Sequence, residues 1–306
     1  MRESIHKYFQ VGTIRWMSFP NRSVVDQVKR IAVDDYFDAI EVTKCADDAE
    51  REEVKKILEQ SHLKVCYGAQ PRLLGPKLNP NDIDEEGRKK AESTLIEAVD
   101  EAEYLGAKGI AFLAGKWEEE TKDQAYAQLL KTTRNVCDYA AKKGMNVELE
   151  VFDFDMDKAA LIGPAPYAAQ FAADMRMTHN NFGLLVDLSH FPTTYETSKF
   201  VIRTLRPYIT HLHFGNAVVE EGCPTVTSPA SGYFIHTVDG YENAVDIDDV
   251  EQLTDYLQVL KEEGFFNAKD PMVLSMEVTL APGEDDEIIL ANTKRCLNRA
   301  WALVED

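Results

Sequence analysis

Apolar residues in this 306-residue chain form short continuous runs, separated by longer stretches in which apolar positions recur at helical spacing. The short runs predict strands buried on both faces, and the longer stretches predict amphipathic helices. Strict alternation of strand and helix favours a parallel sheet with right-handed crossovers. Eight such units in one chain predict an α/β fold of the closed (β/α)8 type, the TIM barrel, rather than an open doubly wound sheet. The predicted strands are residues 8–14, 37–44, 63–70, 108–115, 146–153, 182–187, 209–216 and 271–278.

The pattern predicts a single domain, residues 1–306, with long loops after strands three and seven. Residues 71–84 contain Pro and Gly and are too long for a plain connection, so they are a candidate lid. Residues 217–244 are rich in Gly, Pro, Ser and Thr, and we expect this insertion to fold over the barrel mouth or to make a subunit contact. No GxGxxG motif follows the first strand, which disfavours a dinucleotide-binding fold.

Charge and cysteine usage limit the possible partners and compartment. The chain has 53 acidic and 33 basic side chains, a formal net charge of −20. Because such a field repels phosphate backbones, we expect no nucleic-acid partner. The five cysteines are scattered without a CxxC pair, which is typical of reduced thiols. Neither a signal-peptide core nor a membrane-length apolar run is present, so we expect a cytoplasmic protein with no membrane partner.

Four consecutive predicted strands end near a side chain that can bind metal or move protons: Glu150, Asp187, His213 and Glu277. In a barrel the C-terminal strand ends meet at one mouth, where active sites are built. Three converging carboxylates repel one another unless a cation lies between them. Three oxygen ligands with one imidazole suit Mn²⁺, Mg²⁺ or Co²⁺ better than a structural zinc site. The sequence therefore predicts a single divalent-metal site at the mouth.

Alternation along the strands decides which side chains face the barrel lumen. In strand five Glu148 and Glu150 share the inward face, and in strand seven His211 and His213 do. Glu150 and His213 come later in their strands and so lie nearer the mouth. We therefore prefer them as ligands.

These motifs resemble the sugar phosphate isomerase/epimerase superfamily of xylose-isomerase-like barrels. The resemblance covers essentially the whole chain and rests on VELEVF, VDLSH, HLHFGN and LSMEV. In ketose 3-epimerases of this group, the matching Glu–Asp–His–Glu set binds one metal, the two glutamates exchange a proton on opposite faces of a ketose, and the histidine after the Asp contacts substrate.

The resemblance implies roles for five residues of this chain. Glu150, Asp187, His213 and Glu277 are the implied metal ligands, with Mn²⁺ as the foremost metal. Glu150 and Glu277 are also the implied catalytic acid and base, and His190 is an implied catalytic and substrate contact. The expected reaction removes a proton next to a sugar carbonyl and passes through an enediolate, as in an isomerase or epimerase.

A second resemblance leaves a lyase activity as an alternative function. The segments VGTIRWMSFP and HFGNAV are similar to catalytic subunits of bacterial C-glycoside deglycosidases. Those enzymes deprotonate a 3-oxo-glucoside and eliminate the aglycone, and they work with a small partner subunit. Under either reading the substrate is a small sugar or oxo-glycoside, and Trp16, Lys44 and His236 are candidate substrate contacts. We also expect an oligomer, in which such a partner subunit could take part.

Departures from the family pattern weigh against other functions. The exits of strands three and four, YGAQ and LAG, lack the histidines with which endonuclease IV binds extra zinc ions. No Arg shortly follows His213, where epimerases often place one that binds substrate. A non-catalytic metal- or sugar-binding subunit stays a less favoured alternative, because it needs no pair of glutamates in acid and base positions.

Overall fold

The computed structural model describes residues 3–155, 158–215, 217–219, 234–235, 247–277, 279–280 and 283–305. Eight parallel strands form its central sheet, in the spatial order β3-β2-β1-β10-β7-β6-β5-β4. The ring closes between β3 and β4, where the Ala69 N–H donates to the Ala111 carbonyl at 2.7 Å. The predicted TIM barrel is thereby confirmed. The strands are β1 (Phe9–Ile14), β2 (Ala39–Val42), β3 (Lys64–Tyr67), β4 (Gly109–Leu113), β5 (Asn146–Glu150), β6 (Phe182–Asp187), β7 (Ile209–Phe214) and β10 (Met272–Met276).

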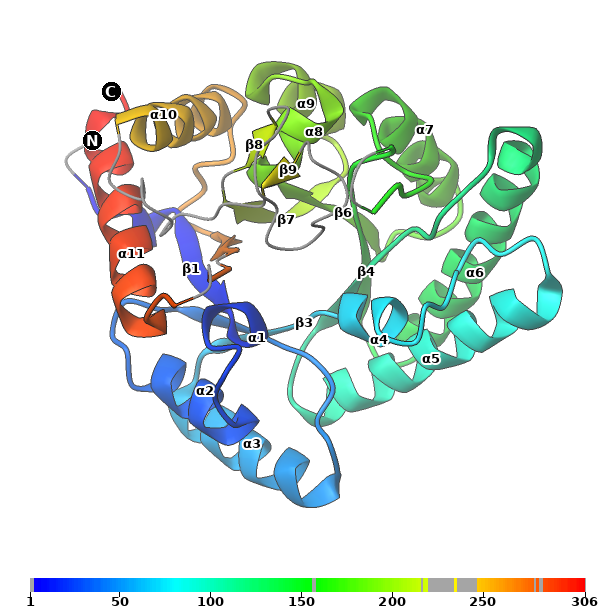
Figure 1. The fold of residues 1–306 in the computed structure, drawn as a ribbon, viewed down its shortest axis with the longest axis horizontal. Helices are drawn as coiled ribbons and strands as arrows, with labels where there is room; N and C mark the ends of the chain where they lie inside the picture. Colours follow the sequence, from blue (N-terminus) through cyan, green and yellow to red (C-terminus); the bar gives the residue numbers. More distant parts are fainter. Residues whose placement is uncertain are drawn as a thin grey trace.

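Helices surround the strands, and the two chain ends lie near each other at the edge of the ring (Figure 1). Glycines with positive φ follow three of the long helices: Gly106, Gly144 and Gly264. A residue without Cβ adopts this left-handed conformation at little cost, so these positions stop the helices as their sequence spacing predicts. The main helices are α2 (Val24–Ala32), α3 (Asp48–Ser61), α5 (Glu85–Tyr104), α6 (Lys122–Ala141), α7 (Ala165–Arg176), α9 (Ser198–Leu205), α10 (Ile247–Glu262) and α11 (Asp286–Leu303).

Short helical turns occur where the sequence predicts loops. They carry too few residues to show a helical period, so the hydrophobic pattern contains no signal for them. Six of the eight strands also end two or three residues earlier than predicted, whereas β1 and β6 end where predicted. After β2, for example, the carbonyls of Thr43 and Lys44 accept hydrogen bonds from the Arg15 guanidinium instead of joining the sheet. The short turns are η1 (Ile5–Lys7), α1 (Arg15–Ser18), α4 (Gln70–Leu74), η2 (Glu119–Thr121), η3 (Leu188–His190) and α8 (Phe191–Thr194).

The long loop after strand seven is described only in part. Its strands β8 (Val218–Val219) and β9 (Phe234–Ile235) form an antiparallel pair. Residues 220–233 and 236–244, with the candidate His236, lie outside the described residues, so the predicted place of this loop over the mouth stays a prediction. Within the described part of the chain, every helix is too short or too polar to span a membrane.

Apolar side chains fill the space between strands and helices, whereas the lumen of the barrel is polar. Thr13, Glu41, His211, His213 and Ser275 point inward and are each at most 3% exposed. Buried polar groups need partners, and the lumen therefore holds a connected set of polar contacts beneath the mouth.

Candidate active site

The four residues predicted from the strand ends meet at the mouth. One ligand atom from each of Glu150, Asp187, His213 and Glu277 can be chosen so that all lie within 4.8 Å of one another. All four side chains belong to buried residues, the most exposed being Glu277 at 8%. Glu150 ends β5, Asp187 ends β6, His213 lies near the end of β7, and Glu277 follows β10. The structure thus brings together a compact set of three carboxylates and one imidazole.

The ring of His213 has one nitrogen facing this set and the other facing away. Its Nδ1 lies 3.1 Å from Glu277 Oε2 and 3.8 Å from Glu150 Oε1. Its Nε2 lies 2.7 Å from Oε1 of Glu41, a buried carboxylate on β2. A proton on Nε2, shared with Glu41, leaves the Nδ1 lone pair directed at the carboxylates. This is the arrangement that a metal-ligating histidine requires.

Asp187 and His190 are positioned by the tight turn η3. The backbone N–H of Ser189 donates to Asp187 Oδ1 at 2.9 Å, and the Ser189 hydroxyl donates to Oδ2. The turn places His190 Nε2 3.5 Å from Glu150 Oε1 and 3.6 Å from Asp187 Oδ2. The His190 ring packs on Phe152 with ring centroids 4.3 Å apart. His190 therefore borders the carboxylates and faces the same Glu150 oxygen as His213.

The mouth is strongly negative. Burial raises the pKa of Asp187, and nearby Glu277 raises it further. Burial alone would lower the pKa of His190, but Glu150 and Asp187 raise it to about 9. His213 behaves in the same way, because Glu41 and Glu277 overcome the effect of burial and raise its pKa well above the usual value. The carboxylates that raise the pKa of both imidazoles would also attract a divalent cation.

The donor set fits a divalent metal ion. Oxygen donors dominate, with one imidazole nitrogen, as Mn²⁺ and Mg²⁺ sites prefer. Glu150 Oε1 is buried and accepts no hydrogen bond from the described residues, although it faces both histidines. A buried carboxylate oxygen without a donor is costly, and a cation held by Glu150, Asp187, His213 and Glu277 would satisfy it.

A cavity of about 200 Å³ opens above these residues. Trp16 and His190, both predicted substrate contacts, line it. Lys44 instead lines a separate cavity beside Arg51 and Arg72. Arg15 holds the backbone at this point, as described above, and the structure does not bring Lys44 to the mouth.

Sequence reasoning missed three residues that line the mouth cavity: Gln70, Phe152 and Lys158. Gln70, at the start of α4, donates from Nε2 to Glu150 Oε2 at 2.7 Å and so fixes the orientation of this carboxylate. Its position in the sequence could have identified it, because Gln70 follows the third strand just as the acidic residues of the site lie at the ends of later strands. Glu41 also lines this cavity and holds the His213 ring through its 2.7 Å contact with Nε2.

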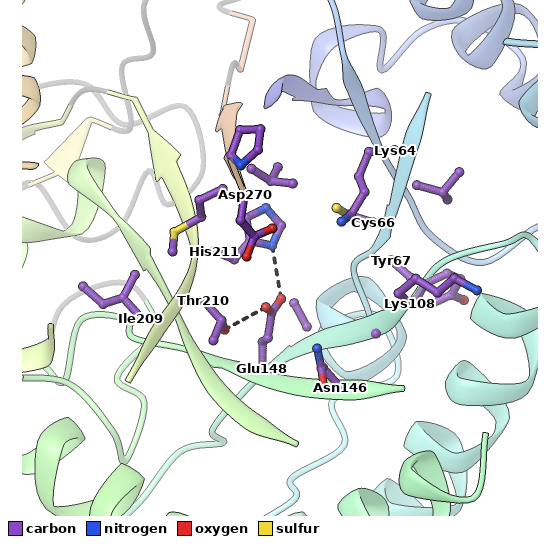
Figure 2. A pocket seen from close by; sticks show the side chains of 16 residues that line it. Lys64, Cys66, Tyr67, Lys108, Asn146, Glu148, Ile209, Thr210, His211 and Asp270 are labelled. Atoms are coloured by element: carbon purple, nitrogen blue, oxygen red, sulfur yellow. Dashed lines mark hydrogen bonds and ion pairs between the residues drawn. The ribbon is translucent and has the colours of Figure 1, made fainter. Parts of the chain in front are cut away.

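A chain of charged side chains, which we call the buried column, continues from Glu41 toward the opposite end of the barrel. Glu41 Oε1 lies 3.2 Å from His211 Nε2, and His211 Nδ1 lies 3.1 Å from Glu148 Oε2. Thr210 donates to Glu148 Oε1 at 2.8 Å. Figure 2 shows these last contacts in a cavity of about 330 Å³, lined by the first residues of several strands. Two acids alternate with two imidazoles from the mouth to the N-terminal end.

Charges along the buried column stabilise one another. Burial would raise the pKa of Glu41, but His213 and His211 lower it well below its usual value. Burial would lower the pKa of His211, but Glu41 and Glu148 raise it to about 9. Glu41 and the two histidines therefore attract one another, which holds these side chains in position beneath the mouth.

The model of the family described as xylose isomerase-like TIM barrel matches residues 30–286. The chain belongs to this family. No curated protein matches the chain. Among solved structures, the chain is similar to D-psicose 3-epimerase with D-tagatose from Clostridium cellulolyticum H10, at 17% identity and a TM-score of 0.70, over 97% of this chain and 100% of that one.

Two further structures of this family type show the same architecture. The apo form of 3-keto-D-glucoside 4-epimerase from E. coli has 15% identity and a TM-score of 0.63, over 96% of this chain and 99% of that one. A xylose isomerase-like TIM barrel protein from Mycobacterium smegmatis in complex with magnesium has 15% identity and a TM-score of 0.60, over 99% and 100%. At such identities the likeness shows a shared fold.

Proposed function

We propose that this chain is a divalent-metal-dependent enzyme that moves a proton at the carbon next to a sugar carbonyl, as an isomerase or epimerase does. One observation carries the proposal: two buried carboxylates, Glu150 and Glu277, both lie close to one histidine nitrogen, within 3.8 Å and 3.1 Å of His213 Nδ1. Two carboxylates at one carbon can remove a proton from one face and return it on the other, which is epimerisation.

Each side chain of the site has its own proposed role. Glu150, Asp187, His213 and Glu277 would hold the metal, which supplies Lewis acidity toward the carbonyl oxygen and its neighbouring hydroxyl. One of Glu150 and Glu277 takes the proton, and the other delivers a proton to the opposite face. His190, whose Nε2 lies 3.5 Å from Glu150 Oε1, donates a hydrogen bond to a substrate oxygen. Gln70 keeps Glu150 oriented through its hydrogen bond.

The metal is proposed as Mn²⁺, with Mg²⁺ or Co²⁺ as alternatives. The oxygen-rich donor set supports this choice, and one structural neighbour was solved in complex with magnesium. We further propose that the protein works in the cytoplasm, in keeping with the free thiols of Cys45, Cys66, Cys137 and Cys296.

Elimination from a 3-oxo-glycoside is the second candidate. Loss of the same proton eliminates a substituent when that substituent sits one carbon further on. A neighbour with the same fold is a 3-keto-D-glucoside 4-epimerase, which supports an oxidised glucoside as the substrate class. The proton-abstracting residues are the same in both reactions.

The test is proton NMR in D₂O with the protein loaded in turn with Mg²⁺ and Co²⁺. The panel contains free ketoses and 3-oxo-glucosides, and the matched variants are Glu150→Gln and Glu277→Gln. Deuterium beside the carbonyl with formation of an epimer or aldose supports the first candidate, and release of a free aglycone supports the second. Each variant is expected to slow exchange at least about 10²-fold. Absence of exchange with every metal and substrate overturns both candidates for the isolated chain.

A further inference from the structure

A second and larger cavity of about 460 Å³, which we call the side cavity, lies beside the mouth cavity. Leu74 and Lys158 line both cavities, so only these side chains need to be passed between the two. The side cavity lies between the segment after β3 and the exit of β4. The residues around it are Leu73, Leu74, Lys77, Leu78, Asn79, Pro80, Leu113, Ala114, Gly115, Lys116 and Lys158.

Charge around the side cavity is opposite to that of the protein. The chain carries 53 acidic and 33 basic side chains, yet Lys77, Lys116 and Lys158 are the charged residues among the described lining, and none of that lining is acidic. A cluster of ammonium groups in a hollow of an acidic protein attracts anions locally. The mouth, by contrast, is built of carboxylates.

The remaining wall is apolar and partly exposed. Leu73 and Leu113 are buried at its base, and Leu74, at the boundary with the mouth, is 43% exposed. An exposed leucine between a metal site and a cluster of lysines provides a contact surface for carbon groups. The occupant therefore combines apolar carbon with negative charge.

Hydrogen bonds hold the segments around the side cavity together. Asn79 and Asn81 donate from Nδ2 to the Lys116 carbonyl at 3.1 Å and 2.8 Å. The Leu161 N–H donates to the Gly115 carbonyl at 2.9 Å. A Cβ at Gly115 would collide with the Asn79 side chain, so this close approach requires glycine. These contacts fix the backbone of the segments that contain the lysines.

We propose that the side cavity binds an anionic part of the substrate while the sugar carbonyl lies at the metal site. This inference rests on the proposed function and names its substrate class: a sugar with a substituent that ends in a phosphate or carboxylate group. The substituent passes Leu74 and Lys158, and its charge reaches Lys77 and Lys116. In both cases the sugar carries a substituent that ends in an anionic group. The substrate is then either a sugar phosphate or a glycoside with an acidic aglycone.

The experiment compares paired ligands by calorimetry on the metal-loaded protein. One pair is D-fructose and D-fructose 6-phosphate, and the other is phenyl and 4-carboxyphenyl 3-oxo-β-D-glucoside. The anionic member of at least one pair is expected to bind about tenfold more tightly than its neutral partner. The preference should fall with added salt, because these ammonium groups are partly exposed. The pair that shows it identifies the source of the anion.

Two substitutions and one control test the assignment to these lysines. Lys77→Asn removes charge at a residue with φ of +57°, a conformation that asparagine tolerates, so folding should not suffer. Combined with Lys116→Met, it should abolish the tenfold preference. Lys122→Met removes one charge near Trp117 and Tyr167, away from the lining of both cavities, and should leave the preference unchanged.

Each outcome decides the matter. Equal affinity for both members of both pairs, no binding of any probe, or the same behaviour in the double variant and the Lys122→Met control overturns the side-cavity proposal. Deuterium exchange into neutral sugars without any charge preference leaves the proposed reaction standing while the side cavity fails. A charge preference that the double variant abolishes, without exchange on any substrate, leaves the side cavity standing while the proposed reaction fails.

Discussion

Glu41 offers a direct test of how the barrel interior supports the proposed metal site, because it touches His213 and none of the other three proposed ligands in the hydrogen bonds and ion pairs described above. Its carboxylate is 1% exposed and lies 2.7 Å from His213 Nε2. Replacement by alanine removes the acceptor that fixes the ring and leaves a buried N–H without a partner. Replacement by glutamine keeps an acceptor of similar shape but removes the charge.

The expected losses follow from the contact that each change removes. A hydrogen bond to a charged group contributes about 1.5–3 kcal/mol, and loss of a partner behind a metal ligand costs about 10- to 100-fold in metal affinity. The free-energy range and the affinity range agree, since a tenfold change in affinity corresponds to about 1.4 kcal/mol. We expect a loss of about 50-fold in Mn²⁺ affinity for Glu41→Ala. Glu41→Gln should lose about fivefold, because a neutral acceptor is roughly half as strong.

Calorimetric titration of the metal-stripped variants with Mn²⁺ measures these losses, and thermal unfolding of the same samples shows whether they fold. Glu101→Gln is the matched control. Glu101 is a buried carboxylate that accepts from the Tyr67 hydroxyl at 2.6 Å, far from the four ligands along the chain. This variant should lose stability and keep its Mn²⁺ affinity. Wild-type affinity in folded Glu41→Ala, or equal losses for Glu41→Ala and Glu41→Gln, would refute the positioning role.

Three other changes have definite expectations. Gln70→Leu removes the 2.7 Å hydrogen bond to Glu150 and should weaken Mn²⁺ binding about tenfold in the same titration; an unchanged affinity would contradict this. Gly68→Ala places a Cβ 2.5 Å from Trp16 Cη2, so a shifted tryptophan fluorescence and a raised KM should follow, and identical spectra would count against that packing. Arg22 lowers the pKa of Asp286 chiefly through their hydrogen bonds. The stability that this ion pair adds to the folded state is complete above pH about 4 and is lost as the pH falls through the lowered pKa of Asp286. Asp286→Asn should therefore cost roughly 1 kcal/mol in urea unfolding at pH 7 and progressively less below pH 4; a constant difference would exclude this cause.

Strand patterning predicted the barrel and its four-residue cluster because both depend on alternation. Glu150 and His213 point inward for the same reason that Leu149 and Leu212 point outward, and parallel strands bring their ends together. The partners of these residues were harder to predict. Gln70 lies in a turn of five residues with no periodic signal, and its contact with Glu150 depends on where α4 begins.

The position of Lys44 shows the same limit. Strand two is predicted to continue to residue 44 but ends at Val42, because the carbonyls of the next residues bind the Arg15 guanidinium, a contact between distant parts of the sequence. The pattern of apolar and polar residues does not reveal such a contact. The side cavity could not be predicted from this pattern either, because its lysines come from three segments that hydrogen bonds bring together.

The buried column changes how substitutions at the two ends of this barrel should be interpreted. In TIM barrels the mouth carries function and the N-terminal end carries stability. Here Thr210 and Glu148 lie at the N-terminal end, yet they hold His211, which faces the same Glu41 oxygen as His213. A substitution of Glu148 can therefore alter the position of His213 at the mouth while every residue of the mouth is unchanged. Substitutions at the N-terminal end of this barrel should thus be tested for effects on the site as well as on stability.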